Sequence, residues 1–210
     1  MVTESAELSA SWVRKAVRPN CRKGIGTGPV SRAPRSSLPM RYFYDTEFIE
    51  DGRTIELVSI GVVAEDGREY YAVSNEFDPE RAGNWVRVNV LSKLPPLASQ
   101  LWRSRRQIRL DLEEFFGVDG SEPTEPIELW AWVGAYDHVA LCQLWGPMPD
   151  LPEALPRFTR EIRQLWEDRG CPRMPPRPRD LHDALVDARD QLRRFRIIMS
   201  ADDVGSLPTH

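Results

Sequence analysis

The sequence predicts a single domain with a mixed α/β fold, in which helices pack on a central sheet. Three strand-like segments follow one another from Arg41, separated by the turn signals "EDGR" and "EDG", and they predict an antiparallel meander. Helical and strand-like patterns then alternate, which is typical of a sheet covered by helices. A chain of 210 residues with 41% hydrophobic and 29% charged residues is long enough for one such domain with its own core.

Each strand and helix is expected at a definite place along the chain. The meander strands are RYFYDTEF (41–48), TIELVSIGVVAE (54–65) and REYYAVS (68–74). A fourth strand, IELWAWV (127–133), follows the polar break GVDGSEPTEP. Helices are expected over about Ala98 to Phe116, over AYDHVALCQLWG (135–146), over Thr159 to Arg169 and over DLHDALVDARDQLRRFRII (180–198). The proline-rich CPRMPPRPRD (171–180) is expected to be a loop.

The residues on either side of the predicted domain, which covers residues 40–200, differ from it in composition. Residues 1–39 are rich in Gly, Pro, Ser and Arg, show no periodicity, and carry seven Lys or Arg against two Glu, a net charge of +5. Such a segment buries too little apolar surface to fold, so we expect a disordered basic extension, with an RNA-binding arm as the alternative. Met40 is expected to mark the natural start of the folded unit, and residues 201–210 a flexible tail.

The charge and the apolar runs exclude several classes of protein. The net charge is −4, and beyond the basic extension 21 basic and 30 acidic residues give −9. An acidic body argues against a protein that simply coats phosphates, but it permits a nucleic-acid enzyme whose acidic residues hold metal ions. No apolar run approaches the roughly 20 residues that span a bilayer, and the N-terminus lacks the apolar core of a secretory signal, so we expect a cytoplasmic protein. The three cysteines indicate neither a disulfide framework nor a zinc site.

Two carboxylates, Asp45 and Glu47, stand at the end of the aromatic first strand. Residues two apart in a strand point to the same face, so these two side chains are expected to project together. Neighbouring carboxylates raise each other's proton affinity unless a cation lies between them. Taken alone, the pair fits two solvated acids at a strand end better than a functional site.

Two further segments carry acidic residues in a comparable setting. Asp137 starts the helix that follows the fourth strand and a Gly-containing turn, and "HDALVD" places His182 near the start of the last helix, with Asp187 five residues on and the small Ala184 between them. Taken singly, Asp137 fits a helix-start carboxylate stabilised by the helix dipole, His182 a cap or surface residue, and Asp187 a solvated acid. The order of the three segments and the elements that carry them favour a joint site.

In this order the segments resemble the DEDDh branch of the 3′-to-5′ exonucleases, which have a ribonuclease H-like fold. That family carries D-x-E on its first strand, an Asp at the head of a middle helix, and H-x-A-x-x-D near the end. The first and last motifs match fully, whereas Trp132 stands where the family's middle motif has Asn, and Tyr136 stands for its aromatic residue. From Met40 to about Ser200, stretches such as "RYFYDTEFIEDG" and "RQLWEDRGCPRMPPRPRD" also resemble the actinobacterial polyadenylate-specific 3′-exoribonucleases, the ribonuclease AS family.

The resemblance implies an enzyme that shortens single-stranded RNA from its 3′ end to nucleoside 5′-monophosphates, with a preference for adenosine-rich RNA. It also implies a homodimer that depends on divalent ions, which we expect to be two Mg²⁺, with Mn²⁺ as the alternative. Asp45, Glu47, Asp137 and Asp187 are the expected metal ligands. His182 is the expected general base, because an imidazole titrates near neutrality and is able to take a proton from the attacking water.

Three residues are candidates for contact with the RNA. Phe48 follows the D-x-E motif and is placed to stack on the terminal base, although core packing explains it equally well, and Arg177 and Arg179 lie shortly before His182. A second basic group on the predicted long helix fits a solvated helix face better: Arg103, Arg105, Arg106 and Arg109. An exonuclease of DNA or of very short oligonucleotides, and a non-catalytic RNA-binding module on the same fold, remain as alternative readings.

Overall fold

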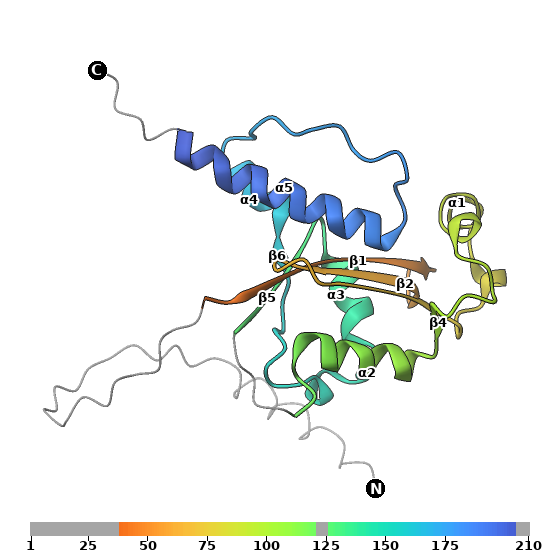
Figure 1. The fold of residues 1–210 in the computed structure, drawn as a ribbon. Coiled ribbons are helices and arrows are strands. Elements are labelled where there is room, and N and C mark those ends of the chain that lie inside the picture. The colour runs from red at the N-terminus through yellow and green to blue at the C-terminus, as the bar shows by residue number, and fades with distance from the viewer. Residues whose placement is uncertain (1–37, 121–125, 205–210) are drawn as a thin grey trace, which may run out of the picture. The chain divides into compact units, whose positions relative to one another are not determined.

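The computed structural model describes residues 38–120 and 126–204, and within them a central sheet lies between two layers of helices (Figure 1). The expectations for the basic extension and for the end of the tail therefore fall largely outside the described residues. Within the described part of the chain, no helix has the length and apolar character needed to cross a membrane.

The sheet has six strands in the order β4-β3-β2-β1-β5-β6. The strands are β1 (Met40–Glu50), β2 (Ile55–Ala64), β3 (Glu69–Ser74), β4 (Trp102–Arg103), β5 (Ile127–Ala131) and β6 (Arg160–Glu161). β1, β2 and β3 form the predicted antiparallel meander, whereas β1 pairs with β5, β3 with β4, and β5 with β6 in parallel. The prediction of a mixed α/β sheet with flanking helices is thus confirmed.

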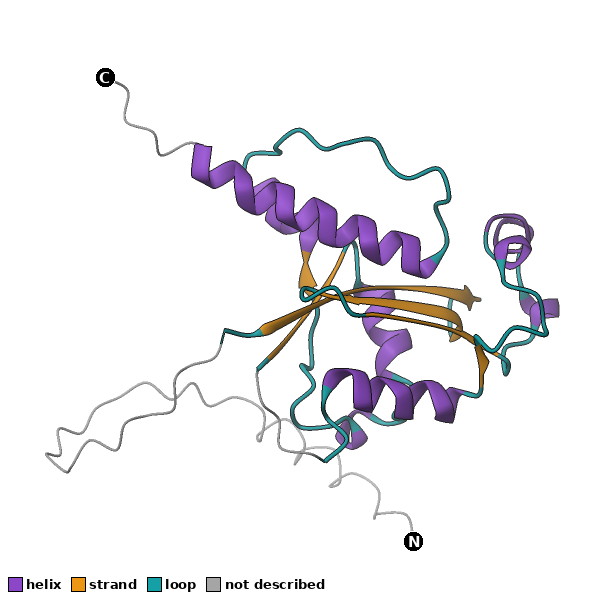
Figure 2. Ribbon diagram, in the orientation of Figure 1, coloured by secondary structure: helices purple, strands orange, loops and turns teal. Residues whose placement is uncertain are grey.

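Helices cover both faces of this sheet, as the purple elements in Figure 2 show. The α-helices are α1 (Asn84–Asn89), α2 (Arg105–Phe116), α3 (Ala135–Cys142), α4 (Ile162–Asp168) and α5 (Ala184–Val204). Short 3-10 helices are η1 (Pro79–Arg81), η2 (Leu91–Lys93) and η3 (Met148–Asp150). α4 and α5 lie over one face of the sheet, and α2 and α3 over the other (Figure 1).

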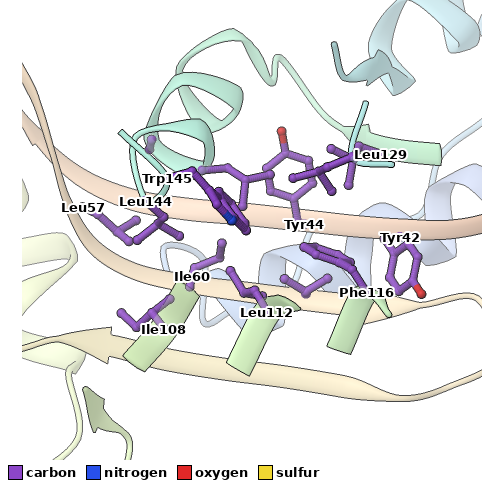
Figure 3. Packing of buried hydrophobic residues seen from close by; sticks show 14 of the residues in the cluster. Tyr42, Tyr44, Leu57, Ile60, Ile108, Leu112, Phe116, Leu129, Leu144 and Trp145 are labelled. Carbon is purple, nitrogen blue, oxygen red and sulfur yellow. The ribbon is translucent and has the colours of Figure 1, made fainter. Parts of the chain in front are cut away.

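Alternation along β1 divides the buried side chains between two cores. Tyr42 and Tyr44 face α2 and α3, where they join the core drawn in Figure 3 with Leu112 and Trp145. Phe43 points to the other face and packs on Phe195 of α5, with 5.0 Å between the ring centroids. The side chains that follow Phe43 at intervals of two, Asp45 and Glu47, are therefore directed toward the α5 face.

Several element boundaries differ from the sequence predictions. α2 begins at Arg105, because Ser104 caps it by accepting a hydrogen bond from Gln107 N (3.1 Å), and the residues before this cap pair with β3 as β4 instead of forming helix. The last helix begins at Ala184, so His182 precedes it. The same helix continues to Val204 and includes residues 201–204, which we expected in the tail.

Candidate active site

The D-x-E carboxylates lie on β1 in the middle of the sheet, where α5 passes over them. Gln191 Nε2 of α5 donates a hydrogen bond to Asp45 Oδ1 (3.0 Å), which fixes one end of the pair. The pairing of β1 with β2 shifts between Glu47 and Phe48, as in a β-bulge. A bulge re-aims the side chains beside it, and here Glu47 and the next residue, Phe48, both line the same cavity.

α5 reaches this position because its first turn packs on a glycine. Gly61 of β2 is the partner of Asp45 in the strand register, and a Cβ built on Gly61 would come within 2.4 Å of Ala184 C and O and of Leu185 N. Ala184 is itself fully buried. The small residue of the H-x-A-x-x-D motif thus allows α5 to approach the sheet, and Asp187, one turn later, faces the D-x-E pair.

Asp137 reaches the site through the turn between β5 and α3. Val133 in this turn has φ +59°, and the Glu161 carboxylate accepts hydrogen bonds from Val133 N (2.7 Å) and Gly134 N (3.1 Å). The turn places Asp137 in the first turn of α3, where Asp137 Oδ1 accepts from Thr46 N (2.8 Å) and Thr46 Oγ1 (2.7 Å). Thr46, which lies between Asp45 and Glu47 on β1, therefore holds the carboxylate of Asp137.

All five residues predicted for the site line one cavity of about 390 Å³: Asp45, Glu47, Asp137, His182 and Asp187. One ligand atom from each of Glu47, His182 and Asp187 lies within 4.8 Å of the other two. His182 itself lies in the loop before α5 with φ +67°, and its backbone N–H donates to Asp187 Oδ2 (2.8 Å). The site thus combines residues from β1, from the first turn of α3 and from the start of α5.

Burial and mutual repulsion raise the proton affinity of the carboxylates. Burial is the main cause, followed by the charges of neighbouring acids, and together they raise the pKa of Glu47 to about 8 and that of Asp45 well above its usual range. Burial also raises the pKa of Asp137 to about 6, against the opposing effect of its hydrogen bonds from Thr46. The pKa of Asp187 is raised, again chiefly by burial, while burial lowers the pKa of His182.

This donor set fits hard divalent cations. Carboxylate oxygens are the ligands that Mg²⁺ and Mn²⁺ prefer, and here they are gathered in one cavity. Glu47 is only 8% exposed and Asp137 7%. Buried acids that repel one another are stabilised as anions when a cation binds between them, so a divalent cation would favour the ionised form of these side chains.

The candidate RNA contacts are placed differently from one another. Phe48 and Arg177 line the cavity, whereas Arg179 is exposed and outside the cavity lining. The ring of Phe48 stacks on that of Tyr136, with 5.7 Å between centroids and 11° between planes. Of the second basic group, Arg105, Arg106 and Arg109 lie on α2, on the opposite face of the sheet from α5 (Figure 1). Arg103 lies on β4 and pairs with Asp111 of α2 (3.6 Å).

Three residues at the site were not singled out from the sequence. Gln191 is one helical turn beyond Asp187, so the helical period is a signal that places it on the same face. Lys93 donates a hydrogen bond to the carbonyl oxygen of Leu181, the residue before His182. It is the single lysine after residue 39, so composition alone distinguishes it. Trp85, which lines the cavity, lies in a stretch with no periodic pattern, and no local signal identifies it.

Comparisons with known proteins agree with this geometry. Residues 40–199 match the family model described as the 3′-5′ exoribonuclease Rv2179c-like domain. Two Mycobacterium tuberculosis proteins, the 3′-5′ exoribonuclease Rv2179c of strain ATCC 25618 / H37Rv and the 3′-5′ exoribonuclease MT2234.1 of strain CDC 1551 / Oshkosh, are each 83% identical over 166 residues, covering 79% of this chain and 97% of theirs. The zinc-bound crystal structure of an E. coli ExoI–ssDNA complex has a TM-score of 0.55 at 11% identity, covering 80% of this chain and 42% of that chain.

The match with the ExoI structure shows a fold shared with an exonuclease, in line with the ribonuclease H-like fold expected from the sequence. The chain belongs to the 3′-5′ exoribonuclease Rv2179c-like family, as the family model and the identity to the mycobacterial proteins show. It is therefore an enzyme of the 3′-5′ exoribonuclease class, and the resemblance noted in the sequence is confirmed.

Proposed function

We propose that this enzyme is a metal-dependent exoribonuclease that shortens single-stranded RNA from the 3′ end to nucleoside 5′-monophosphates, by a two-metal-ion mechanism with His182 as general base. The observation that carries the proposal is the convergence on one cavity of four acids from three elements beside a histidine. Family membership sets aside the alternative of a non-catalytic RNA-binding module.

Asp45, Glu47, Asp137 and Asp187 would hold the metal. Bound there, two divalent cations would supply the positive charge that makes a phosphodiester susceptible to attack by water. We propose Mg²⁺ as the cation in the cell, with Mn²⁺ as the alternative, because all four side chains offer hard oxygen donors. Gln191 and Thr46 keep Asp45 and Asp137 in place by the hydrogen bonds described above.

His182 would accept the proton of the attacking water. Burial lowers the pKa of His182, so its imidazole is neutral near pH 7 and has a free nitrogen lone pair. Its backbone N–H is anchored on Asp187, which keeps the ring beside the carboxylates. Geometry and protonation state therefore both support a general base at this position.

The cavity wall supports binding of a single strand at its 3′ end. Arg177 is placed to contact a backbone phosphate, with exposed Arg179 as an outer contact, and Phe48 with Tyr136 offers an aromatic surface for a base. The preference for adenosine-rich RNA is proposed on the sequence resemblance. Activity on DNA or on very short oligonucleotides is the alternative within the same chemistry.

A homodimer and a cytoplasmic location complete the proposal, and both follow from the sequence alone. The homodimer is implied by the resemblance, and light scattering of the purified full-length chain tests it. A mass of about 48 kDa, twice the 24.1 kDa of one chain, is expected, whereas a mass of one chain at micromolar concentration would contradict it.

Digestion of 5′-labelled oligo(A), oligo(U) and oligo(dA), with Mg²⁺ and with EDTA, tests the activity. We expect stepwise shortening that needs metal, that is fastest on oligo(A), and that falls by about 10²–10⁴-fold in His182→Ala, the range usual for a general base. His138→Gln is the matched control, because the ring of His138 contacts Thr159 and Cys142 instead of the cavity.

Each part of the proposal has its own contradictory result. Equal rates on oligo(A) and oligo(dA) would remove the selectivity for RNA, and equal rates on oligo(A) and oligo(U) the adenosine preference. Undiminished shortening in EDTA would contradict the dependence on metal. A parental rate in His182→Ala would contradict the role of His182 as general base.

A further inference from the structure

His182 adopts a backbone conformation that its own side chain does not favour. Its φ of +67° lies in the left-handed region, which is unfavourable for residues other than glycine and is retained only where the surroundings fix it. The hydrogen bond from His182 N to Asp187 fixes one side of this residue. Contacts from a second side are needed to define where its imidazole points.

The segment from α1 to η2 supplies those contacts. The ring of Trp85 on α1 meets the imidazole of His182 edge-to-face, with 4.7 Å between centroids and 81° between planes. At the end of η2, Lys93 Nζ donates a hydrogen bond to the carbonyl oxygen of Leu181, the residue before His182. Both contacts fall on the loop that carries the histidine.

Core packing does not explain the position of Trp85. Its side chain is 56% exposed, and α1 contains no buried residue. The segment is attached to the sheet by Val86 and Leu91, which pack against Ile49 and Val58. Trp85 therefore projects from an anchored segment toward the cavity and rests there on His182.

We propose that Trp85 and Lys93 are positioning residues for His182. Trp85 limits the orientations of the imidazole ring, and Lys93 holds the backbone that carries it. This inference rests on the proposed role of His182 as general base. Because both residues contact His182 or the residue before it, their removal is expected to slow the chemical step and to leave substrate binding nearly unchanged. Loss of the uncharged Trp85 should also leave metal binding nearly unchanged.

A double-mutant cycle with the full chain tests the proposal. Trp85→Ala and Lys93→Met are each expected to lower kcat on oligo(A) about tenfold with KM within about twofold. In the His182→Ala background, measured under single-turnover conditions with excess enzyme, neither substitution should lower the rate further. Trp85→Phe, which keeps an aromatic edge, should restore most of the rate.

Controls separate positioning from folding. Val88→Ala is the matched control, because Val88 is 59% exposed on the same helix and is not part of the cavity lining. Calorimetric titration with Mn²⁺ should give the same affinity for Trp85→Ala as for the parent. With ¹³C-labelled histidine, the ring resonances of His182 should shift in Trp85→Ala and those of His138 should not.

Different results would contradict the positioning role of Trp85 and Lys93 and the proposed role of His182 as general base. A raised KM with unchanged kcat would make Trp85 a direct substrate contact, and an equal loss of kcat in both backgrounds would show that it does not act through His182. Parental kcat in Trp85→Ala and Lys93→Met, with His182→Ala inactive, would overturn the positioning role alone. A parental rate in His182→Ala would overturn the general base, and the positioning role with it.

Discussion

Hydrogen bonds from two neighbouring polar side chains fix two of the acids of the site. Thr46 donates twice to Asp137, and Gln191 donates once to Asp45. These donors favour the ionised carboxylate and oppose the effect of burial on its pKa. Residues that hold a ligand without touching the metal contribute to affinity, because they orient the ligand before the metal arrives.

Gln191→Leu should therefore weaken metal binding. The substitution keeps a similar volume, removes the donor to Asp45, and leaves the carboxylate free to rotate and easier to protonate. We expect a loss of about tenfold or more in Mn²⁺ affinity by calorimetric titration near pH 7, the range usual for such partners. Gln164→Leu is the control, since Gln164 is exposed on α4. Equal affinities for parent and Gln191→Leu would show that the hydrogen bond does not orient the ligand.

At the scale of elements, the site depends on how closely α5 approaches the sheet. Gly61 and Ala184 leave only backbone between β2 and the first turn of α5. Asp187 and Gln191 follow on the same helix, so the contact at Gly61 sets the distance of both from Asp45. Gly61 thus sets the distance between the residues of the site on α5 and those on β1.

Gly61→Ala should disturb stability and metal binding together. Its Cβ would lie 2.4 Å from backbone atoms of α5, so the helix has to move away from the sheet. Overpacking of this kind typically costs about 1–3 kcal/mol in the free energy of unfolding, measured with urea. Mn²⁺ affinity should fall as well, because Asp187 moves with the helix.

The matched control for this substitution is Gly83→Ala. Gly83 has φ −65° and no atom within 4 Å of an added Cβ, so this substitution should leave metal binding almost unchanged. Its effect on stability should be limited to the cap of the short helix α1 and smaller than that of Gly61→Ala. Parental Mn²⁺ affinity in Gly61→Ala would mean that the start of α5 adjusts without moving Asp187.

What the sequence predicts at this scale follows from local patterns. The meander strands and the D-x-E face rest on period-two alternation, which the structure retains through Phe43, Asp45 and Glu47. The β4 strand was missed, because its pairing with β3 depends on residues distant in sequence. The starts expected for α2 and α5 are too early, because the cap at Ser104 and the left-handed conformation of His182 interrupt helical patterns that extend upstream of both positions.

The residues of the candidate site also divide into those that local sequence motifs identify and those that only tertiary packing reveals. The five motif residues were identified in sequence because their types and order are distinctive, and the structure brings them to one cavity. Trp85 reaches His182 only through the packing of α1 and η2 on the sheet, and this tertiary contact leaves no periodic trace in the sequence. Sequence patterns therefore indicate which groups are candidates for the chemistry, and the fold determines which other residues contact them.

For the whole molecule, the acidity of the chain and the proposed dependence on metal have the same cause. Beyond the first 39 residues the chain carries a net charge of −9, and the four acids expected to be metal ligands share one cavity. Without a cation these acids oppose both one another and an RNA phosphate. Binding of metal should therefore stabilise the folded protein as well as prepare it for substrate.

The pH dependence of stability in EDTA should report this repulsion. The pKa of Glu47 is raised from 4.5 to about 8, so between these values the folded protein keeps a proton that the unfolded chain has released. Stability is then lost as pH rises through this window, by up to about 1.4 kcal/mol per pH unit for one such group. The lowered pKa of His182 acts in the opposite direction, but only below its ordinary value of 6.5. The informative interval is therefore pH 6.5 to 8.

Urea unfolding across that interval should show a free energy of unfolding that falls with pH in EDTA. With saturating Mg²⁺ the decline should be much smaller, because the metal binds the ionised acids and grows more stabilising as pH rises. Glu47→Gln, a neutral substitute of the same size, should flatten the curve in EDTA and gain less from Mg²⁺. A parental curve in EDTA that is flat or rises from pH 6.5 to 8 would show that the folded protein compensates the charge of these carboxylates without a metal ion.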